Sequence, residues 1–183
     1  MALARFLIGA AVVRVAPEGR TAARIVETEA YVPGDAAAHS FRGRTARNRS
    51  LFLSRGHAYV YFIYGSHYCL NVSAERVGVG AGVLIRAGEP LEGVEIMRGR
   101  RGGVDGRDLL RGPGRFAQAL AIGAEHDGLD LCAAGPLWLA TAPGPKPKIG
   151  VSRRIGLTKE VERPLRFFDK QSDAVSGPKY LLS

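Results

Sequence analysis

Lysine is scarce in this chain of 183 residues and is absent before Lys146. A lysine amine is the usual group for Schiff-base chemistry, so such chemistry would need one of the five lysines at positions 146, 148, 159, 170 and 179. The other 21 of the 26 basic residues are arginines. Arginine binds phosphate through two parallel hydrogen bonds and stacks on bases, although a coding bias towards Ala, Gly and Arg explains the ratio equally well.

Cysteine and long hydrophobic runs are also rare. Cys69 and Cys132 form no C-x-x-C pair and have no metal-ligand spacing with any histidine, so we expect neither a disulfide framework nor a metal site. The apolar segment 6–13 is too short for a membrane span and is interrupted by a glycine. No signal peptide with an A-x-A site follows. We therefore expect an intracellular protein in a reducing compartment, without a membrane partner.

Acidic residues are missing from residues 36–74, although the chain contains 17 of them. The same stretch holds five arginines and four of the six tyrosines, namely Arg42, Arg44, Arg47, Arg49, Arg55, Tyr59, Tyr61, Tyr64 and Tyr68. The formal net charge is +9 and the pI is near 10.1, which favours an acidic partner. A cationic surface beside aromatic rings favours nucleic acid, because bases stack on tyrosine.

The residue patterns predict mostly strands, with few and short helices. A short helix running into a strand is expected over 5–15, and further strands over 24–30, 58–63, 68–73, 83–86, 137–139 and 165–168. Helices are expected over 91–101 and 115–122, and Thr45 is expected to cap a helical turn through residue 49. The Gly-Pro-Gly run at 112–114 offers backbone N–H groups for a phosphate. Residues 133–150 are predicted to form a loop that contains one strand.

Two carboxylates on the strand 24–30 are candidates for catalysis. Strict alternation places Glu27 and Glu29 on one face together with Ile25. They are either an active-site carboxylate with a structural neighbour or an exposed polar edge. Arg86 ends an apolar strand, and a buried arginine needs a carboxylate partner, which Glu29 or Glu89 is expected to supply.

The predicted hairpin over residues 58–73 is the second candidate. Tyr64 precedes Gly65, whose positive φ suits a tight turn, and an aromatic side chain there is placed to act as a wedge in the minor groove. Tyr59 and Tyr61 share one face of their strand, although packing of the sheet is the ordinary explanation for such tyrosines. Asn71 lies inside a strand, where asparagine is disfavoured, so we expect its side chain to have a specific role.

These candidates fall in an ordered set of sequence blocks. The blocks are Arg24-Ile25-Val26-Glu27-Thr28-Glu29-Ala30-Tyr31, Ala38-His39-Ser40, Thr45-x-Arg47-Asn48, Tyr59-Val60-Tyr61-x-x-Tyr64-Gly65, Asn71, Val83-Leu84-Ile85-Arg86-Ala87-x-Glu89-Pro90-Leu91-Glu92-Gly93 and Gly112-Pro113-x-Arg115-x-x-Gln118-Ala119-Leu120. Together they resemble the alkyladenine (3-methyladenine) DNA glycosylases, over nearly the whole chain. The N-terminus is shorter than is usual in that family, and Phe116 stands where the family more often has Leu.

The resemblance implies a mixed α/β (α+β) fold, with residues 1–183 forming a single domain around a curved antiparallel sheet and a protruding β-hairpin. It implies that Glu29, and not Glu27, is the general base that activates water, with Arg86 helping to hold that water and the carboxylate. It implies a substrate pocket formed by Tyr31, His39, Tyr61 and Asn71, the last rejecting guanine, and a DNA wedge at Tyr64. The arginines expected to contact DNA are Arg42, Arg44, Arg47 and Arg115.

The chemistry of such an enzyme agrees with these residues. A base inside a duplex must be extruded and held between aromatic faces, and a cationic alkylated adenine is attracted to tyrosine rings by cation–π interaction. Since no lysine lies among the motifs, we expect water attack on alkylated, deaminated or etheno purines that leaves an intact abasic site. The expected partner is double-stranded DNA with damaged purines. We expect a monomer without a cofactor, in the cytoplasm and, in a bacterium, at the nucleoid.

Two other interpretations remain open at this stage. A non-catalytic nucleic-acid-binding module explains the arginines and the wedge but gives Glu29 no purpose. A hydrolase of another glycosidic substrate would use Glu27 and Glu29 as a pair, but such carboxylates flank the bond from two sides, roughly 5 to 9.5 Å apart. A membrane-surface protein is disfavoured because no basic amphipathic helix is visible.

Overall fold

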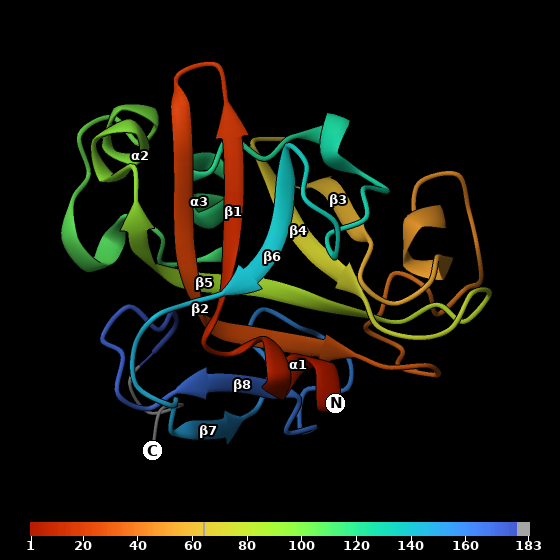
Figure 1. Ribbon diagram of the computed structural model, residues 1–183. Coiled ribbons are helices and arrows are strands. Elements are labelled where there is room, and N and C mark those ends of the chain that lie inside the picture. Colours follow the sequence, from red (N-terminus) through yellow and green to blue (C-terminus); the bar gives the residue numbers. More distant parts are fainter. Residues whose placement is uncertain (64, 179–183) are drawn as a thin grey trace.

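The computed structural model describes residues 1–63 and 65–178, and within them eight strands form one antiparallel sheet (Figure 1). The strand order is β3-β4-β5-β2-β1-β6, and β8 pairs with both β2 and β7. The strands are β1 (Ala10–Ala16), β2 (Gly19–Tyr31), β3 (Ala58–Ile63), β4 (His67–Ser73), β5 (Gly82–Glu92), β6 (Leu137–Thr141), β7 (Ile149–Ser152) and β8 (Arg166–Asp169). The helices are α1 (Ala2–Leu7), α2 (Val94–Arg100) and α3 (Pro113–Ala119), with 3-10 turns η1 (Arg49–Phe52), η2 (Gly106–Asp108) and η3 (Ala124–His126).

The long strand β2 runs through the middle of this sheet. Its first half pairs with β1 and its second half with β8, while β5 lies along its other edge. The β2–β5 register shifts on both sides of Glu27, and such bulges re-aim side chains. Ile25 packs in the same core cluster as Ala30, whereas Val26 belongs to a second cluster. The uninterrupted alternation expected over 24–30, with Ile25 on the face of Glu29, is therefore wrong.

The main apolar core lies where the helices meet the sheet. It includes Leu7 from α1, Met97 from α2 and Phe116 from α3, all fully buried. Burying a side chain of this size stabilises the fold by about 1.5–3 kcal/mol. Helix α1 is also held to β2 by a hydrogen bond of 3.0 Å, which the Thr28 hydroxyl donates to the carbonyl of Ala4. This contact anchors the second half of β2, the segment that carries the two candidate carboxylates.

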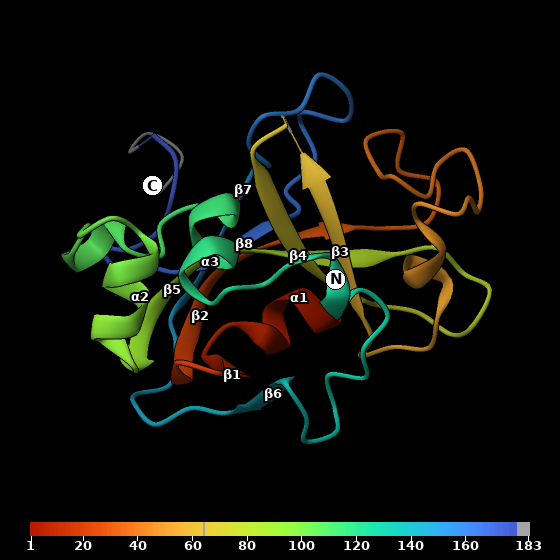
Figure 2. The ribbon, with the colours of Figure 1, turned by 90° about the horizontal axis from the view of Figure 1, so that it is seen from above.

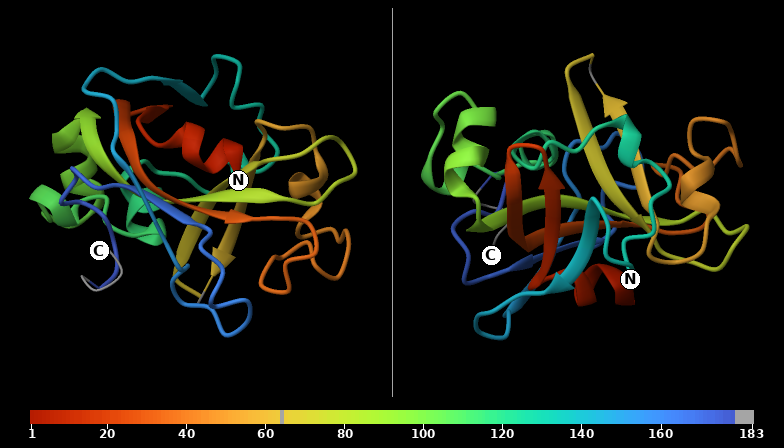
Figure 3. Two further views of the ribbon diagram at one scale, coloured as in Figure 1. Left: turned by 90° about the horizontal axis from the view of Figure 1, so that it is seen from below. Right: turned by 45° about the horizontal axis from the view of Figure 1, so that its top comes forward.

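Strands β3 and β4 form the expected hairpin, paired from Ala58↔Val72 to Ile63↔His67. The hairpin projects from the sheet together with the loops over 33–48 and 153–165, and α1 lies on the opposite side (Figures 2 and 3). The expected mixed fold around a curved antiparallel sheet with a protruding hairpin is thus confirmed. Tyr64, the predicted wedge, lies outside the residues that the structure describes.

Three local expectations were inaccurate. Leu91 was expected in a helix, but β5 continues through Glu92 and α2 begins only at Val94. Residues 149–152 form strand β7, because their backbone groups pair with β8, which no pattern in this Pro- and Gly-rich region indicated. Thr45 accepts a hydrogen bond from the backbone of Asn48, but the helical turn is the 3-10 turn η1 that follows.

Among the described residues, no helix has the length and apolarity needed to cross a membrane. Both cysteines are free thiols; Cys69 is buried and Cys132 is exposed.

Candidate active site

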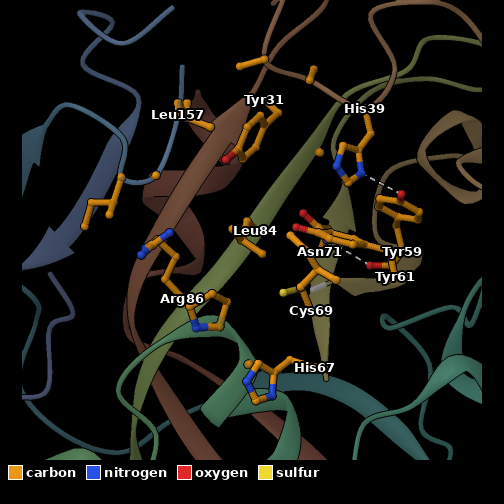
Figure 4. A pocket seen from close by; sticks show the side chains of 18 of the residues that line it. Tyr31, His39, Tyr59, Tyr61, His67, Cys69, Asn71, Leu84, Arg86 and Leu157 are labelled. Atoms are coloured by element: carbon orange, nitrogen blue, oxygen red, sulfur yellow. Dashed lines mark hydrogen bonds between the residues drawn. The ribbon is translucent and has the colours of Figure 1, made fainter. Parts of the chain in front are cut away.

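A cavity of about 510 Å³ lies between the hairpin, the loop that follows β2, the beginning of α3 and residues 155–157 (Figure 4). Small-molecule sites in proteins are typically about 300–1,000 Å³ in volume. The cavity wall includes five of the residues predicted to bind substrate or to act in catalysis, which are Tyr31, His39, Tyr61, Asn71 and Arg86. These residues come from β2, the loop after it, β3, β4 and β5, so the curvature of the sheet gathers residues that are distant in sequence.

One end of the cavity is aromatic. The ring of Tyr61 lies 4.5 Å from that of His39, edge-on, and 5.4 Å from that of Tyr59, stacked. The Tyr59 hydroxyl and His39 Nδ1 are 2.9 Å apart and share a hydrogen bond. Asn71 donates a hydrogen bond of 3.2 Å to the carbonyl of Tyr59. Across the cavity, Tyr31 closes the same end (Figure 4).

The titratable groups at this aromatic end stay neutral. Burial raises the pKa of Tyr59 to about 12 and also raises the pKa values of Tyr31 and Tyr61, so these hydroxyls remain donors. For Tyr31 the charge of Glu29 adds to the effect of burial. Partial burial, and secondly the charge of Arg47, lower the pKa of His39 below its usual value. The imidazole is therefore neutral at neutral pH, although His39 is exposed to solvent.

A buried cluster of two carboxylates and two guanidinium groups lies beside the cavity. Arg86 donates to Glu27 Oε1 at 2.9 Å through Nε and lies 3.2 Å from Glu29 Oε1 through Nη1. Arg166 also donates to Glu27 Oε1, at 2.7 Å, and the backbone N–H of Ser176 donates to Glu27 Oε2 at 2.7 Å. Burial opposes the charge on Arg86, but Glu29 and Glu27 outweigh it and raise the pKa of the guanidinium.

Glu29 itself is fully buried and lies behind the cavity wall. Its Oε2 accepts a hydrogen bond of 3.0 Å from the Tyr31 hydroxyl, and its Oε1 accepts one of 2.8 Å from the backbone N–H of Ile155. Tyr31, Ile155 and Arg86 all line the cavity. Each residue that holds Glu29 is therefore also part of the cavity wall. The alternative that Glu27 and Glu29 form an exposed polar edge is wrong, since neither is exposed.

The arginines predicted to bind DNA are divided between two places. Arg115 lines the cavity where α3 begins and lies 3.4 Å from Asp108. Arg42, Arg44 and Arg47 are exposed on the projecting loop outside the cavity. Arg47 also donates a hydrogen bond of 3.1 Å to the carbonyl of Phe62 on the hairpin, which ties the loop to β3.

Several groups around the cavity were not found from the sequence. The expected partner of Arg86 included Glu89, but Glu89 instead accepts a hydrogen bond from Ser172, and Glu27 takes its place. The guanidinium carbon of Arg154 lies 4.7 Å from the centre of the Tyr31 ring, and Arg154 is fixed by a buried ion pair with Asp35. No local sequence pattern indicated these contacts, because they join residues that are 59 to 123 positions apart in the chain.

Comparisons with known proteins agree on one family. The family described as "Methylpurine-DNA glycosylase (MPG)" matches residues 1–173. A protein of Mesorhizobium japonicum is 62% identical over 180 residues, covering 98% of this chain and 86% of the relative. One of Paraburkholderia phytofirmans is 52% identical, covering 98% and 84%, and one of Chlorobaculum parvum is 49% identical, covering 95% and 84%. All three bear the name "Putative 3-methyladenine DNA glycosylase".

Proposed function

We propose, from the premise that this chain belongs to the methylpurine-DNA glycosylase family, that it turns a damaged purine nucleotide out of duplex DNA and hydrolyses its N-glycosidic bond. Family membership itself makes the chain a DNA glycosylase for alkylated bases. The observation that carries the rest of the proposal is the connection of Glu29 to the cavity through Tyr31, Arg86 and Ile155. Base binding and bond cleavage would then take place within one set of contacts.

The aromatic end suits a planar, electron-poor base. Tyr31 faces His39 and Tyr61 across the cavity (Figure 4), and stacking on such rings is worth about 1–3 kcal/mol per base. A purine alkylated at N3 carries a positive charge, which tyrosine faces attract. The neutral imidazole of His39 does not repel that charge. Asn71, with its amide fixed to the Tyr59 carbonyl, is the proposed residue that rejects the exocyclic amine of guanine.

Glu29 is the proposed general base. A carboxylate offers about four lone-pair sites, and Tyr31, Ile155 and Arg86 occupy three of them. The remaining site would accept the proton of a water molecule that attacks the anomeric carbon. Arg86, which stays charged between its two carboxylates, would hold that water and stabilise the carboxylate.

The reaction is proposed to leave an intact abasic site. Among the described residues that line the cavity there is no lysine, so no amine is available there for a Schiff base. A cationic alkylated purine is already a good leaving group, whereas neutral deaminated and etheno purines need a proton. The tyrosines and the neutral His39 are weak acids at this site. We therefore propose that neutral lesions are excised more slowly than cationic alkylated purines.

Double-stranded DNA is the proposed partner, approached by the side from which the hairpin projects. Arg42, Arg44 and Arg47 on the exposed loop and Arg115 at the cavity are proposed to contact phosphates. Such contacts fix the position of the protein on the duplex without reading sequence. Tyr64 is proposed to fill the gap left by the extruded base, and the working unit is proposed to be a monomer.

The decisive experiment measures base release from a duplex with a single 3-methyladenine, with Kd measured in parallel. Glu29→Gln removes the base but keeps a side chain of the same shape, so release should fall by about 10²–10⁴-fold while binding persists. Asn71→Asp and Arg115→Gln serve as comparison variants, since they alter recognition and leave Glu29 in place. Equal release by wild type and Glu29→Gln would overturn the role of Glu29.

Two further outcomes test the remaining parts of the proposal. Binding without release by the wild-type protein, across alkylated, deaminated and etheno purines, would leave only a non-catalytic binding module. A covalent adduct trapped by borohydride would show amine chemistry and overturn the water mechanism.

A further inference from the structure

Resting on the proposed function and going beyond it, we propose that Arg111 binds a phosphate of the extruded nucleotide, and that Asp108 holds Arg111 in place until this phosphate arrives. Arg111 lines the cavity but is not part of the blocks on which the sequence resemblance depends. The proposal follows from the charge distribution along the cavity, from the anchoring of Arg111 and from the weakness of its ion pair.

The two ends of the cavity differ in charge. The end formed by Tyr31, His39 and Tyr61 is aromatic and neutral. At the other end, where the chain enters α3, the wall contains Arg111 and Arg115. Arg86 also contributes to the wall, but the carboxylates of Glu27 and Glu29 compensate its charge.

An alkylated purine nucleotide has the matching polarity. Its cationic base is attracted by aromatic faces and repelled by arginines, whereas its phosphates are bound by arginines. Only one orientation in the cavity satisfies both ends, with the base against Tyr31 and Tyr61 and a phosphate near Arg111. The same orientation brings the sugar, which joins base and phosphate, towards Arg86 between them.

Arg111 is fixed within the cavity wall. Its backbone forms a β-bridge with Ala87, the neighbour of Arg86 on β5. Its Nε donates a hydrogen bond of 2.9 Å to the carbonyl of Val175. The side chain keeps 24% of its surface exposed. A guanidinium with its Nε already bonded presents its remaining N–H groups in a fixed direction, which lowers the entropy lost when a phosphate binds.

The ion pair that holds Arg111 is easily exchanged. Asp108 is shared among three arginines, at 3.9 Å from Arg107, 3.6 Å from Arg111 and 3.4 Å from Arg115. One carboxylate against three guanidinium groups leaves an excess of positive charge. Exposed pairs of this kind contribute little to stability, and Asp108 is 45% exposed. A phosphate that accepts two hydrogen bonds from Arg111 is therefore a stronger partner than Asp108.

The three arginines provide a matched comparison. Arg107 pairs with the same carboxylate but is absent from the cavity wall, and its side chain is 55% exposed. We compare Arg111→Gln with Arg107→Gln, using a duplex with one 3-methyladenine and the identical undamaged duplex, over a range of salt concentrations. Arg111→Gln should weaken binding of the damaged duplex about tenfold, as expected when one hydrogen bond to a charged group is lost, and should lower the salt slope for that duplex by about 0.9.

Binding of the undamaged duplex by Arg111→Gln should stay at the wild-type value, because an undamaged nucleotide remains in the helix. Arg107→Gln should change the affinity for the damaged and the undamaged duplex by the same factor. Equal weakening of both duplexes by Arg111→Gln, or no weakening of either, would overturn the proposal. Base release by the wild-type protein in the same assay separates this failure from a failure of the proposed function.

A second variant covers the case in which Arg111→Gln does not fold. Asp108→Asn removes the competing carboxylate but keeps the side-chain shape, so Arg111 and Arg115 are freed for phosphates. It should bind the damaged duplex more tightly than the wild type does, and this gain should exceed any gain for the undamaged duplex, because Arg111 meets a phosphate only when a nucleotide is extruded. Unchanged or weaker binding by Asp108→Asn would show that Asp108 does not compete with phosphate and would overturn the proposal.

Discussion

Arg86 has a sealed side and a cavity side, and the two carboxylates that it binds differ accordingly. On the sealed side, Glu27 is bonded to Arg86, Arg166 and the backbone of Ser176, all buried. On the cavity side, Glu29 is held by groups that line the cavity. Both carboxylates are fully buried on the same strand, two residues apart. Burial and residue type therefore do not distinguish Glu27 from Glu29, the proposed general base, whereas the surroundings of their partners do.

The difference originates in the backbone around Glu27. The β2–β5 register shifts on both sides of this residue, and β8 reaches β2 only at Glu27, Thr28 and Glu29. Arg166 enters through β8 and can pair with Glu27, while Ile155, in the chain between β7 and β8, reaches Glu29. The same local irregularity that permits the buried cluster thus also separates its two carboxylates.

The largest effect on stability is expected from Glu27→Gln. This change leaves Arg166 and Arg86 with one carboxylate fewer in a buried site, and breaking a buried ion pair costs about 3–5 kcal/mol. Urea unfolding should show this loss. Glu29→Gln should lose clearly less, because Glu27 pairs with both Arg86 and Arg166, whereas Glu29 pairs with Arg86. Equal losses of unfolding free energy in the two variants would abolish the distinction between the sealed side and the cavity side.

Tyr31→Phe sharpens the comparison on the cavity side. The variant keeps the stacking ring but deletes the hydroxyl that donates to Glu29 Oε2 at 3.0 Å. A hydrogen bond to a charged group is worth about 1.5–3 kcal/mol, so the rate of base release should fall roughly 10- to 100-fold. Single-turnover base release from the saturated complex measures this loss.

Tyr59→Phe is the matched control for that change. Tyr59 is buried and its hydroxyl bonds His39 and not Glu29, so its rate of base release should fall clearly less than that of Tyr31→Phe. Equal losses of rate in Tyr31→Phe and Tyr59→Phe would show that the hydroxyl of Tyr31 does not act on Glu29. Charged neighbours of Glu29 common to both variants, namely Arg86 and Glu27, cancel in this comparison.

A smaller effect is expected from the titration of His39. Its pKa is lowered by partial burial and by Arg47. The neutral form therefore predominates above about pH 6.5, the ordinary pKa of histidine, and is lost as the pH falls through the lowered value. Protonated His39 would repel a cationic base. Affinity for 3-methyladenine duplexes should thus fall about two- to fivefold on acidification, and less so in His39→Gln. Binding of duplexes with a neutral etheno purine should not show this fall.

The sequence predicted the hairpin, the central strand and six residues of the cavity wall, because these lie in short sequence patterns. The six residues are Tyr31, His39, Tyr61, Asn71, Arg86 and Arg115. Tyr59 and Tyr61 alternate within one strand, and Glu29 is two residues from Tyr31. The partners of the two carboxylates could not be predicted from the sequence, for a physical reason. Arg166 is 139 residues from Glu27 and the N–H of Ile155 is 126 residues from Glu29, and a backbone N–H has no residue signature. Which carboxylate is sealed depends on such long-range contacts.

The smallest effect on the excision step is expected from Arg42→Gln and Arg44→Gln. Both arginines are exposed on the projecting loop. On the sealed side of Arg86, by contrast, the removal of a charge is expected to destabilise the whole fold. Losing one phosphate contact should lower the salt slope of binding by about 0.9 per arginine and weaken damaged and undamaged duplexes alike. Release from the saturated complex should stay at the wild-type rate, since these side chains do not contact the cavity. A reduced rate at saturation would mean that the loop positions the nucleotide. The burial of a charged side chain would then not indicate whether it acts in binding or in base release.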